Sequence, residues 1–270
     1  MKKILCVFAF LSILFLSACV SDDTESLKFE KIDDSTCRVV GYVKDNKKKT
    51  RYKIPEYYDG MLVVEIKEWA FRGNEDVEKI ILPNSIVTIG AVAFQRCIKL
   101  KSINIPNGTK TIGGGAFIHC DSLEKIELPD SIEDMGDRLF SGCIILKDVK
   151  LPNGLKILPQ GTFTQCNSLV EINLPESIEI IEDGAFAHCD SLKKIKFPSR
   201  LTEIGSYAFS FCNSLEEIVI PRSVVIINKE AFYYNDKLKK VYCEVEEKLE
   251  GWNKFWIHPV PEVIWSYKEA

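Results

Sequence analysis

A repeat of 23 residues runs through most of this chain. Phenylalanine recurs at this spacing eight times, cysteine six times and proline seven times, with no insertion between copies. The positions are Phe71, Phe94, Phe117, Phe140, Phe163, Phe186, Phe209 and Phe232; Cys97, Cys120, Cys143, Cys166, Cys189 and Cys212; and Pro83, Pro106, Pro129, Pro152, Pro175, Pro198 and Pro221. A constant period of this length is typical of a solenoid, in which each repeat packs only against its neighbours.

Each repeat contains one short segment with the pattern of a half-buried strand. In one copy Ile126 and Leu128 alternate with Lys125 and Glu127, which is the two-residue period of a strand with one buried side. Pro129 then ends the strand, because proline has no N–H for a ladder hydrogen bond. The pattern predicts one outward-charged, inward-apolar strand per coil.

The Ala-Phe-x-x-Cys segment of each repeat is predicted to form one helical or 3₁₀ turn. Ala116, Phe117 and Cys120 lie three or four residues apart, so a single turn directs all three inward. A single coil cannot bury its own apolar side, and we therefore expect the coils to stack into ladders of Phe on Phe and Cys on Cys. Eight coils at ~4.8 Å each give a stack of roughly 38 Å.

The outward strand positions carry charges that alternate in sign from one repeat to the next. One column reads Glu78, Lys101, Glu124, Lys147, Val170, Lys193, Glu216 and Lys239, and a second reads Lys125, Asp148, Glu171, Lys194, Glu217 and Lys240. Opposite charges on neighbouring strands stabilise a sheet by ~0.2–1 kcal/mol a pair. We interpret these columns as solvated ladder pairs rather than as a ligand site.

The whole motif resembles that of a known family. Leu-x-x-Ile-x-Leu-Pro-x-Ser-Ile-x-x-Ile-x-x-x-Ala-Phe-x-x-Cys, repeated eight times over about residues 65–243, is similar to the BspA-like bacterial leucine-rich repeat. The resemblance implies a curved, right-handed β-solenoid with a parallel sheet on its concave face. Members of that family are commonly surface or secreted proteins that bind other proteins, including host matrix components, so it implies a non-enzymatic binding or adhesion role.

The N-terminus has the features of a bacterial lipoprotein signal. Residues 1–18 combine two early lysines with an apolar run that is too short to remain as a membrane span. Leu16-Ser17-Ala18-Cys19 resembles a lipobox, so Cys19 is predicted to be the lipidated first residue of the mature protein. The alternative is an ordinary signal peptide with a chance cysteine. The expected location is exported, with a lipid anchor in the outer membrane or at the cell surface.

Composition divides the remaining chain and argues against nucleic acid as a partner. We expect a polar tether over residues 19–26, an N-terminal β cap over 27–59, the repeats over 60–243 and a Trp-rich C-terminal cap over 244–270. The net charge is −4, and removal of residues 1–18 with their two lysines makes it −6. An acidic chain disfavours nucleic-acid binding. The lysines at 44–49 are interpreted as a solvated turn between two predicted strands, residues 38–43 and 51–54.

No residue pattern indicates catalysis, a metal site or a cofactor. The cysteines of the column lie next to inward phenylalanines, where a free thiol behaves as a small apolar group, and we predict them to be reduced. His119 and His188 share a column but lie three repeats apart, roughly 14 Å at ~4.8 Å per coil. That separation is too long for a metal or catalytic pair, so neither an enzyme nor a small-molecule substrate is expected.

The most distinctive outward residues lie on the turns of the last three repeats. The residues that precede the Cys position are His188, Phe211, Tyr233 and Tyr234, where other copies carry modest side chains. We predict that they form a strip that either binds a partner or is covered by the C-terminal tail with Trp252 and Trp256. If the tail covers the strip, binding is expected instead at the concave strand columns around Lys194, Lys196, Glu217 and Val219.

Three classes of function remain in competition. The first is a surface-anchored protein that binds a protein partner outside the cell, and the second is a structural or scaffold lipoprotein inside the envelope. The third is glycan binding, which would require exposed aromatic residues in the strand columns, where only Tyr242 occurs. The sequence favours the first class, without naming the partner.

Overall fold

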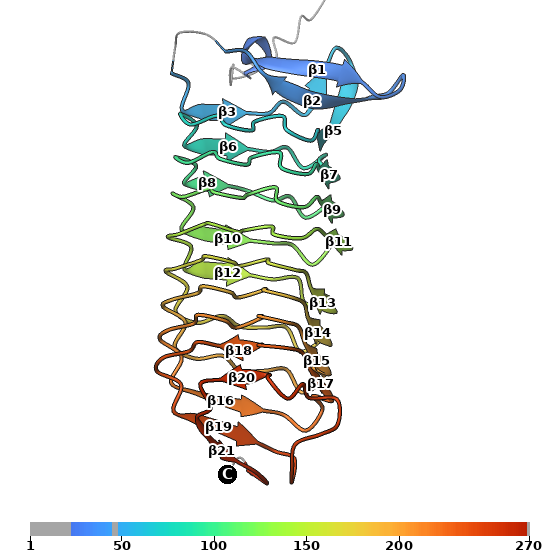
Figure 1. Cartoon of the computed structure of the whole chain (residues 1–270). Coiled ribbons are helices and arrows are strands. Elements are labelled where there is room, and N and C mark those ends of the chain that lie inside the picture. The colour runs from blue at the N-terminus through green and yellow to red at the C-terminus, as the bar shows by residue number, and fades with distance from the viewer. Residues whose placement is uncertain (1–22, 45–47, 269–270) are drawn as a thin grey trace, which may run out of the picture.

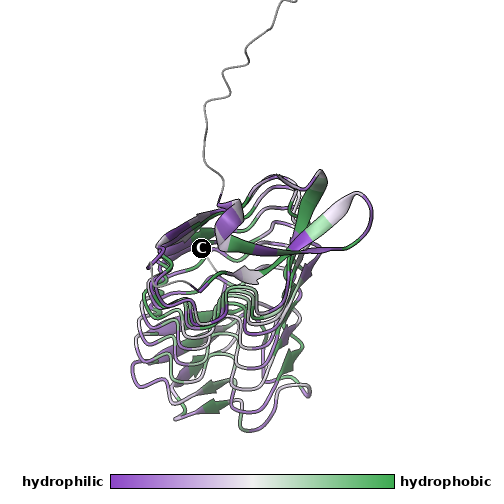
Figure 2. Cartoon of the chain, turned by 90° about the horizontal axis from the view of Figure 1, so that it is seen from above, coloured by the Kyte–Doolittle hydropathy of each residue, from purple (hydrophilic) through white to green (hydrophobic). Residues whose placement is uncertain are grey.

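The computed structural model describes residues 23–44 and 48–268. It shows an elongated stack of coils, with the N-terminal strands at one end and the C-terminus at the other (Figure 1). Viewed down the stack, successive coils retrace one another (Figure 2). The predicted parallel β-solenoid is therefore confirmed. Among the described residues the only helical element is one 3₁₀ turn, η1 (Thr24–Ser26).

Two sides of the stack are built from short parallel strands. The first side, called the strand face here, contains β3 (Arg51–Lys53), β6 (Lys79–Ile81), β8 (Ser102–Ile103), β10 (Lys125–Glu127), β12 (Asp148–Lys150), β16 (Glu217–Ile220), β19 (Lys240–Cys243) and β21 (Glu262–Ile264). The second side contains β5 (Met61–Ile66), β7 (Thr88–Ile89), β9 (Thr111–Ile112), β11 (Asp134–Met135), β13 (Ile157–Leu158), β14 (Ile180–Ile181), β15 (Glu203–Ile204) and β17 (Ile226–Ile227).

Register between the coils follows the 23-residue period. In the pair β10–β12, Ile126 lies opposite Val149, and in β14–β15, Ile181 lies opposite Ile204. Both partners differ by 23 in number, so every column of the sequence becomes a column in space. The position after the second strand requires glycine for a steric reason in at least one coil: a Cβ on Gly113 would collide with the backbone of Ala91 in the preceding coil.

The third side, which carries Ala-Phe-x-x-Cys, corrects the predicted helical turn. We call residues 69–73 and their equivalents up to 230–234 the turn face. The N–H of Gln95 donates to Val92 three residues back at 3.1 Å, whereas the N–H of Phe94 donates to Ala116 of the next coil at 2.8 Å. A 3₁₀ helix would use every N–H internally and would keep φ negative, but φ is +49° at Val92. The segment is a series of tight turns that also forms an inter-coil ladder.

The core is a continuous stack of aromatic rings. The rings of Phe71 to Phe232 lie 5.0–5.7 Å apart from one coil to the next. Each of these side chains is fully buried. Burial of a side chain of this size stabilises a fold by roughly 1.5–3 kcal/mol, so this ladder is a principal source of stability.

The N-terminal end is closed by strands that differ from the expected hairpin. β1 (Leu27–Lys31) pairs antiparallel with β2 (Thr36–Tyr42). β2 pairs in parallel with β5, and β4 (Tyr57–Tyr58) pairs antiparallel with β5. The sequence suggested that residues 38–43 and 51–54 lie together around the lysine-rich turn. Instead, β3 pairs with β6 on the strand face. β2 is therefore the strand that precedes β5 on the second side of the solenoid, and β3 is the first strand of the strand face.

The C-terminal segment closes the other end as a further partial coil. β18 (Phe232–Tyr233) pairs in parallel with β20 (Ile257–His258), and Trp256 meets the ring of Phe232 edge-on at 5.9 Å. Trp252 is 2% exposed and donates through Nε1 to the carbonyl of Val224 at 3.1 Å. These tryptophans supply the cover that an end coil of a solenoid needs.

Candidate binding surface

The turn face holds two columns of residues in the left-handed backbone region. One column comprises Gly73, Arg96, His119, Gly142, Gln165, His188, Phe211 and Tyr234, and the other comprises Trp69, Val92, Gly115, Arg138, Gly161, Gly184, Tyr207 and Glu230. Positive φ is uncommon for residues with a Cβ and is an outlier for bulky ones. Glycine, which has no Cβ, avoids this steric cost, and it occupies five positions in these columns. The presence of large side chains at other positions of the columns therefore needs another explanation.

Phe211 is the centre of an aromatic cluster in the last coils of this face. Its ring stacks on His188 at 4.6 Å with an interplanar angle of 4°, and on Tyr234 at 5.7 Å with an angle of 5°. Tyr233 stands nearly perpendicular to both neighbours, at 5.8 Å from Phe211 and 4.4 Å from Tyr234. The structure therefore brings together all four residues of the strip predicted from the sequence.

Two residues that the sequence analysis did not assign to the strip complete the cluster. Tyr207, in the second left-handed column, meets Tyr233 edge-on at 6.4 Å. His258 follows Tyr234 in the ladder, because the N–H of Tyr234 donates to the carbonyl of His258 at 2.6 Å. A hydrogen bond with Glu230 raises the pKa of Tyr207 and lowers that of Glu230, so the phenol stays neutral. The 23-residue count could have found Tyr207, but not His258.

The C-terminal tail extends this cluster instead of lying across it. Trp252 and Trp256 are buried against the end of the core, whereas the exposed fraction is 42% for Tyr234 and 41% for Tyr207. His188, Phe211 and Tyr233 are half-buried. Of the two arrangements that the sequence left open, the described residues adopt the one in which the strip remains at the surface.

The geometry of the rings limits what the cluster can bind. Both faces of Phe211 are occupied, one by His188 and the other by Tyr234. Sugar binding by stacking needs a free ring face, which Phe211 does not offer. The exposed parts are ring edges and phenol groups, which combine apolar area with hydrogen-bonding capacity, as at protein interfaces.

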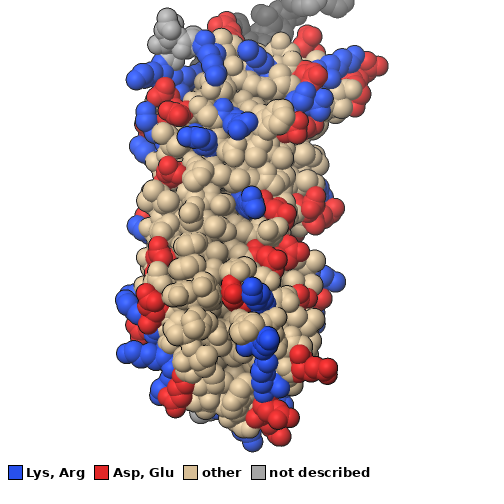
Figure 3. Space-filling view, in the orientation of Figure 1, with Lys and Arg blue, Asp and Glu red and all other residues tan. Residues whose placement is uncertain are grey.

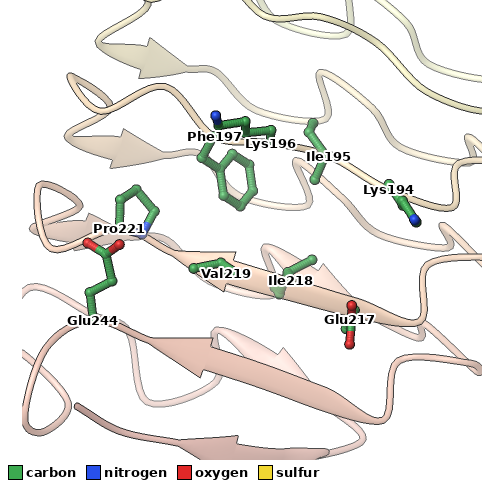
Figure 4. Close-up of a pocket in the computed structure, with 9 residues that line it drawn as sticks. All are labelled: Lys194, Ile195, Lys196, Phe197, Glu217, Ile218, Val219, Pro221 and Glu244. Atoms are coloured by element: carbon green, nitrogen blue, oxygen red, sulfur yellow. The ribbon is translucent and has the colours of Figure 1, made fainter. Parts of the chain in front are cut away.

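The four alternative strand-face residues line a pocket of about 280 Å³. Lys194, Lys196, Glu217 and Val219 lie around an apolar centre that includes Phe197, between the coil at 194–197 and β16 (Figure 4). The equivalent position is Leu or Ile in six other coils, at 82, 105, 128, 151, 174 and 220. The larger Phe197 ring is 7% exposed and packs edge-on against Phe209.

The charged columns pair in the N-terminal coils and not at this pocket. Lys101 Nζ lies 2.8 Å from Glu78 Oε2, and Lys125 Nζ lies 3.0 Å from Asp148 Oδ2. Residues 171–174 and 194–197 form no strand, and Lys194 and Glu217 have no ion-pair partner among the described residues. The pocket is therefore a second, smaller surface, and its rim carries charged side chains that have no ion-pair partner among the described residues.

The predicted cysteine column is buried and made of free thiols. Cys97, Cys120, Cys143, Cys166, Cys189 and Cys212 are 0% exposed, and each Sγ–H donates to the carbonyl of the Phe 26 residues earlier, at 3.1–3.3 Å. Burial raises the pKa of Cys97, Cys143 and Cys212 to about 12. These thiols are protonated at neutral pH, so they suit neither nucleophilic attack nor metal binding.

The histidines and acids do not assemble a catalytic or metal site in the described part of the chain. His119 Nδ1 lies 3.8 Å from Asp121 Oδ1, and burial raises the pKa of Asp121. His188 and His258 belong to the aromatic cluster. No group of three or more His, Cys, Asp or Glu side chains among the described residues could hold a metal ion. Over the same residues, no helix is long and apolar enough to cross a bilayer.

The comparisons with known proteins agree with this architecture. A model described as the BspA type leucine rich repeat region, in 6 copies, matches residues 64–179 and 156–254. The chain belongs to the BspA-type leucine-rich-repeat family. The resemblance seen in the sequence is thereby confirmed. Members of this family are typically non-catalytic, and membership suggests protein binding or adhesion.

Solved structures of bacterial leucine-rich-repeat proteins share the fold. The T. pallidum protein TpLRR is 31% identical, with a TM-score of 0.65 over 71% of this chain and 88% of that one. A leucine-rich repeat protein from Bacteroides ovatus is 26% identical, with a TM-score of 0.64 over 89% of this chain and 75% of that one. A search of curated proteins finds no significant match.

Proposed function

We propose that this BspA-type solenoid is an exported, lipid-anchored protein that binds a protein partner through its aromatic cluster. The cluster consists of His188, Phe211, Tyr234, Tyr233, Tyr207 and His258. The partner is expected on an external surface, such as a matrix or cell-surface protein. The family supports protein binding in general, and the cluster supports this location on the solenoid.

One observation carries the assignment of the site. Four members of the aromatic cluster, His188, Phe211, Tyr234 and Tyr207, have φ between +50° and +59°. His119 and Trp69 in the same two columns also have positive φ, but they make no ring contact among the described residues. Left-handed backbone costs an L-residue roughly 1–2 kcal/mol, whereas the glycines in the same columns avoid that cost. Ring stacking offsets part of it, at roughly 0.5–1.5 kcal/mol per pair. Strained bulky residues that gather in one cluster at the surface are expected where binding, rather than stability, determines the residue.

The anchor belongs to the proposal on sequence grounds. Cys19 lies outside the described residues, and its lipidation rests on Leu16-Ser17-Ala18-Cys19. The described chain begins at the N-terminal end of the stack, and the aromatic cluster lies in the last coils. An anchor at Cys19 would therefore place the cluster at the end far from the membrane. A scaffold lipoprotein inside the envelope remains the competing function.

Binding of the purified full-length protein to a panel of immobilised matrix and cell-surface proteins tests the proposal. The double substitution Phe211→Ser with Tyr234→Ser should reduce affinity tenfold or more, because it removes the central ring and its exposed neighbour. The melting temperature should change little. The matched control is His119→Ser with Gln165→Ser, which alters the same left-handed column in other coils and should bind normally.

Two outcomes would contradict the assignment. Equal binding by the double variant and the native protein would move the site to the pocket at Lys194 and Glu217. A large fall in melting temperature would show that the cluster serves stability. Protection from protease on whole cells, with digestion only after the envelope is opened, would favour the scaffold role.

A further inference from the structure

The N-terminal end of the solenoid concentrates positive charge in a chain that is acidic overall. Residues 23–44 and 48–53 contain eight Lys or Arg against five Asp or Glu, a net charge of +3, whereas the whole chain carries −4. On the face seen in Figure 3, Lys and Arg side chains lie over this end together with Asp and Glu side chains. The charge is therefore distributed unevenly along the stack.

Four described cations between residues 44 and 53, and Lys79 on the neighbouring β6, lack ion pairs among the described residues. They are Lys44, Lys48, Arg51, Lys53 and Lys79, which we call the basic end. Four are exposed and Lys53 is half-buried. Two nearby acids already have partners, because Asp23 pairs with Lys49 at 2.6 Å and Asp76 with Lys99 at 2.9 Å, which leaves Glu56 and Glu75 as the described acids beside these cations that are unpaired. The basic end thus remains available to an external anion.

The register of the strand face adds an independent observation. Arg51 on β3 lies directly opposite Lys79 on β6. Like charges in this position destabilise a sheet, and further along the same face opposite charges form pairs, as in Lys101 with Glu78. At Arg51 and Lys79 the alternation of charge sign between neighbouring strands is interrupted. An external anionic partner would compensate for their repulsion.

The chain enters the fold next to this basic end. The N–H of Asp23 donates to the carbonyl of Lys53, and the N–H of Lys53 donates to Asp23 Oδ2 at 2.6 Å. Asp23 lies only four positions after Cys19, and four residue steps span at most ~14 Å. The Debye length is ~8–10 Å at physiological salt. A lipid at Cys19 would hold the basic end within about two Debye lengths of the headgroups.

We propose that the basic end docks on an anionic lipid surface and fixes the orientation of the solenoid. This inference rests on the proposed anchor at Cys19. Each Lys or Arg near an anionic surface strengthens the association roughly fivefold. The stack then stands on its N-terminal end, and the aromatic cluster lies about 40 Å from the membrane, given eight coils at ~4.8 Å each. Docking and partner binding therefore use opposite ends of the molecule.

Lysine footprinting of the full-length protein on vesicles tests this orientation. The protein, purified from a lipidating host, is placed on neutral phosphatidylcholine vesicles or on vesicles with about 30% phosphatidylglycerol, and lysine acetylation is followed by mass spectrometry. Acetylation of Lys44, Lys48 and Lys79 should slow at least fivefold on the anionic vesicles and recover in about 0.5 M salt. Lys237 and Lys240, at the far end, should react equally on both. Equal rates at the basic end on both vesicles would overturn the proposal.

Charge variants separate this inference from the anchor itself. Lys48→Gln with Arg51→Gln and Lys79→Gln should abolish the protection of the remaining reporter, Lys44, whereas Lys237→Gln with Lys239→Gln and Lys240→Gln removes the same charge and should preserve it. Failure of the protein to float with neutral vesicles would refute the anchor. In that case, salt-sensitive flotation with anionic vesicles would still support docking by the basic end. Failure to float with anionic vesicles as well would overturn this docking.

Discussion

The buried thiol column should make this solenoid unusually sensitive to alkali. In the folded chain burial raises the pKa of Cys143 to about 12, from an ordinary value of 9.0, and the other five column thiols are raised in the same direction. The folded state therefore retains protons that the unfolded state releases above about pH 9. Stability is fully present below that pH and is lost as the pH rises toward 12.

The size of the loss follows from the number of thiols. At about pH 10, each thiol that ionises only in the unfolded chain lowers the free energy of unfolding by about 1.4 kcal/mol. Six such thiols lower it by about 8 kcal/mol, which is comparable with the total stability of a typical domain, ~5–15 kcal/mol. The native protein should consequently unfold in the region of pH 9.5–10, roughly where these thiols ionise in an unfolded chain.

Urea melts between about pH 8 and pH 10, under reductant and argon, measure this dependence. Cys143→Ala should cost about 1–2 kcal/mol at pH 8 through its small cavity, and it should reduce the loss of stability between pH 8 and pH 10 by about 1.4 kcal/mol in total. The difference in slope between the two proteins isolates the thiol from titrating lysines and tyrosines. Identical slopes, or a native stability independent of pH in this range, would refute the reasoning.

Three further predictions follow from the packing and the N-terminus. Phe163→Ala, in the middle of the ring stack, should lower the free energy of unfolding by about 3–5 kcal/mol in denaturant melts; a loss below about 1 kcal/mol would contradict a stacked core. Gly113→Ala should strongly destabilise the fold because its Cβ meets the backbone of Ala91, whereas Gly154→Ala, with nothing within 4 Å, should be nearly neutral. Cys19→Ser should transfer the protein from the detergent phase to the aqueous phase in Triton partitioning, and unchanged partitioning would exclude the anchor.

The 23-residue period was sufficient to predict the ladders of the core. Once Phe117 and Phe140 occupy equivalent positions, stacking at one strand spacing places their rings together, and no other information is needed. The same count placed His188, Phe211 and Tyr234 in one column. These predictions succeeded because each depends only on which residues occupy equivalent positions in successive coils.

Features that depend on backbone geometry or on the size of a single side chain were not predictable in this way. The spacing of Phe117 and Cys120 fits a 3₁₀ turn as well as it fits the observed turns, because the inter-coil hydrogen bonds exist only in the stack. Phe197 was not recognised as part of the pocket on the strand face, although its departure from Leu or Ile was visible. His258 belongs to the cluster because the C-terminal tail continues the inter-coil hydrogen-bond ladder of the turn face. The tail lacks the repeat motif, so the motif could not predict this position.

The most direct test of the central claim is site-specific photo-crosslinking on intact cells. A photoreactive phenylalanine analogue at Phe211 should capture a partner protein, because this position lies at the centre of the aromatic cluster. The same analogue at Gln165, two coils away in the same left-handed column, should not capture it. Capture that is equal at both positions, or absent at 211 while an analogue at Val219 captures a protein, would contradict the assignment of the binding surface to the aromatic cluster.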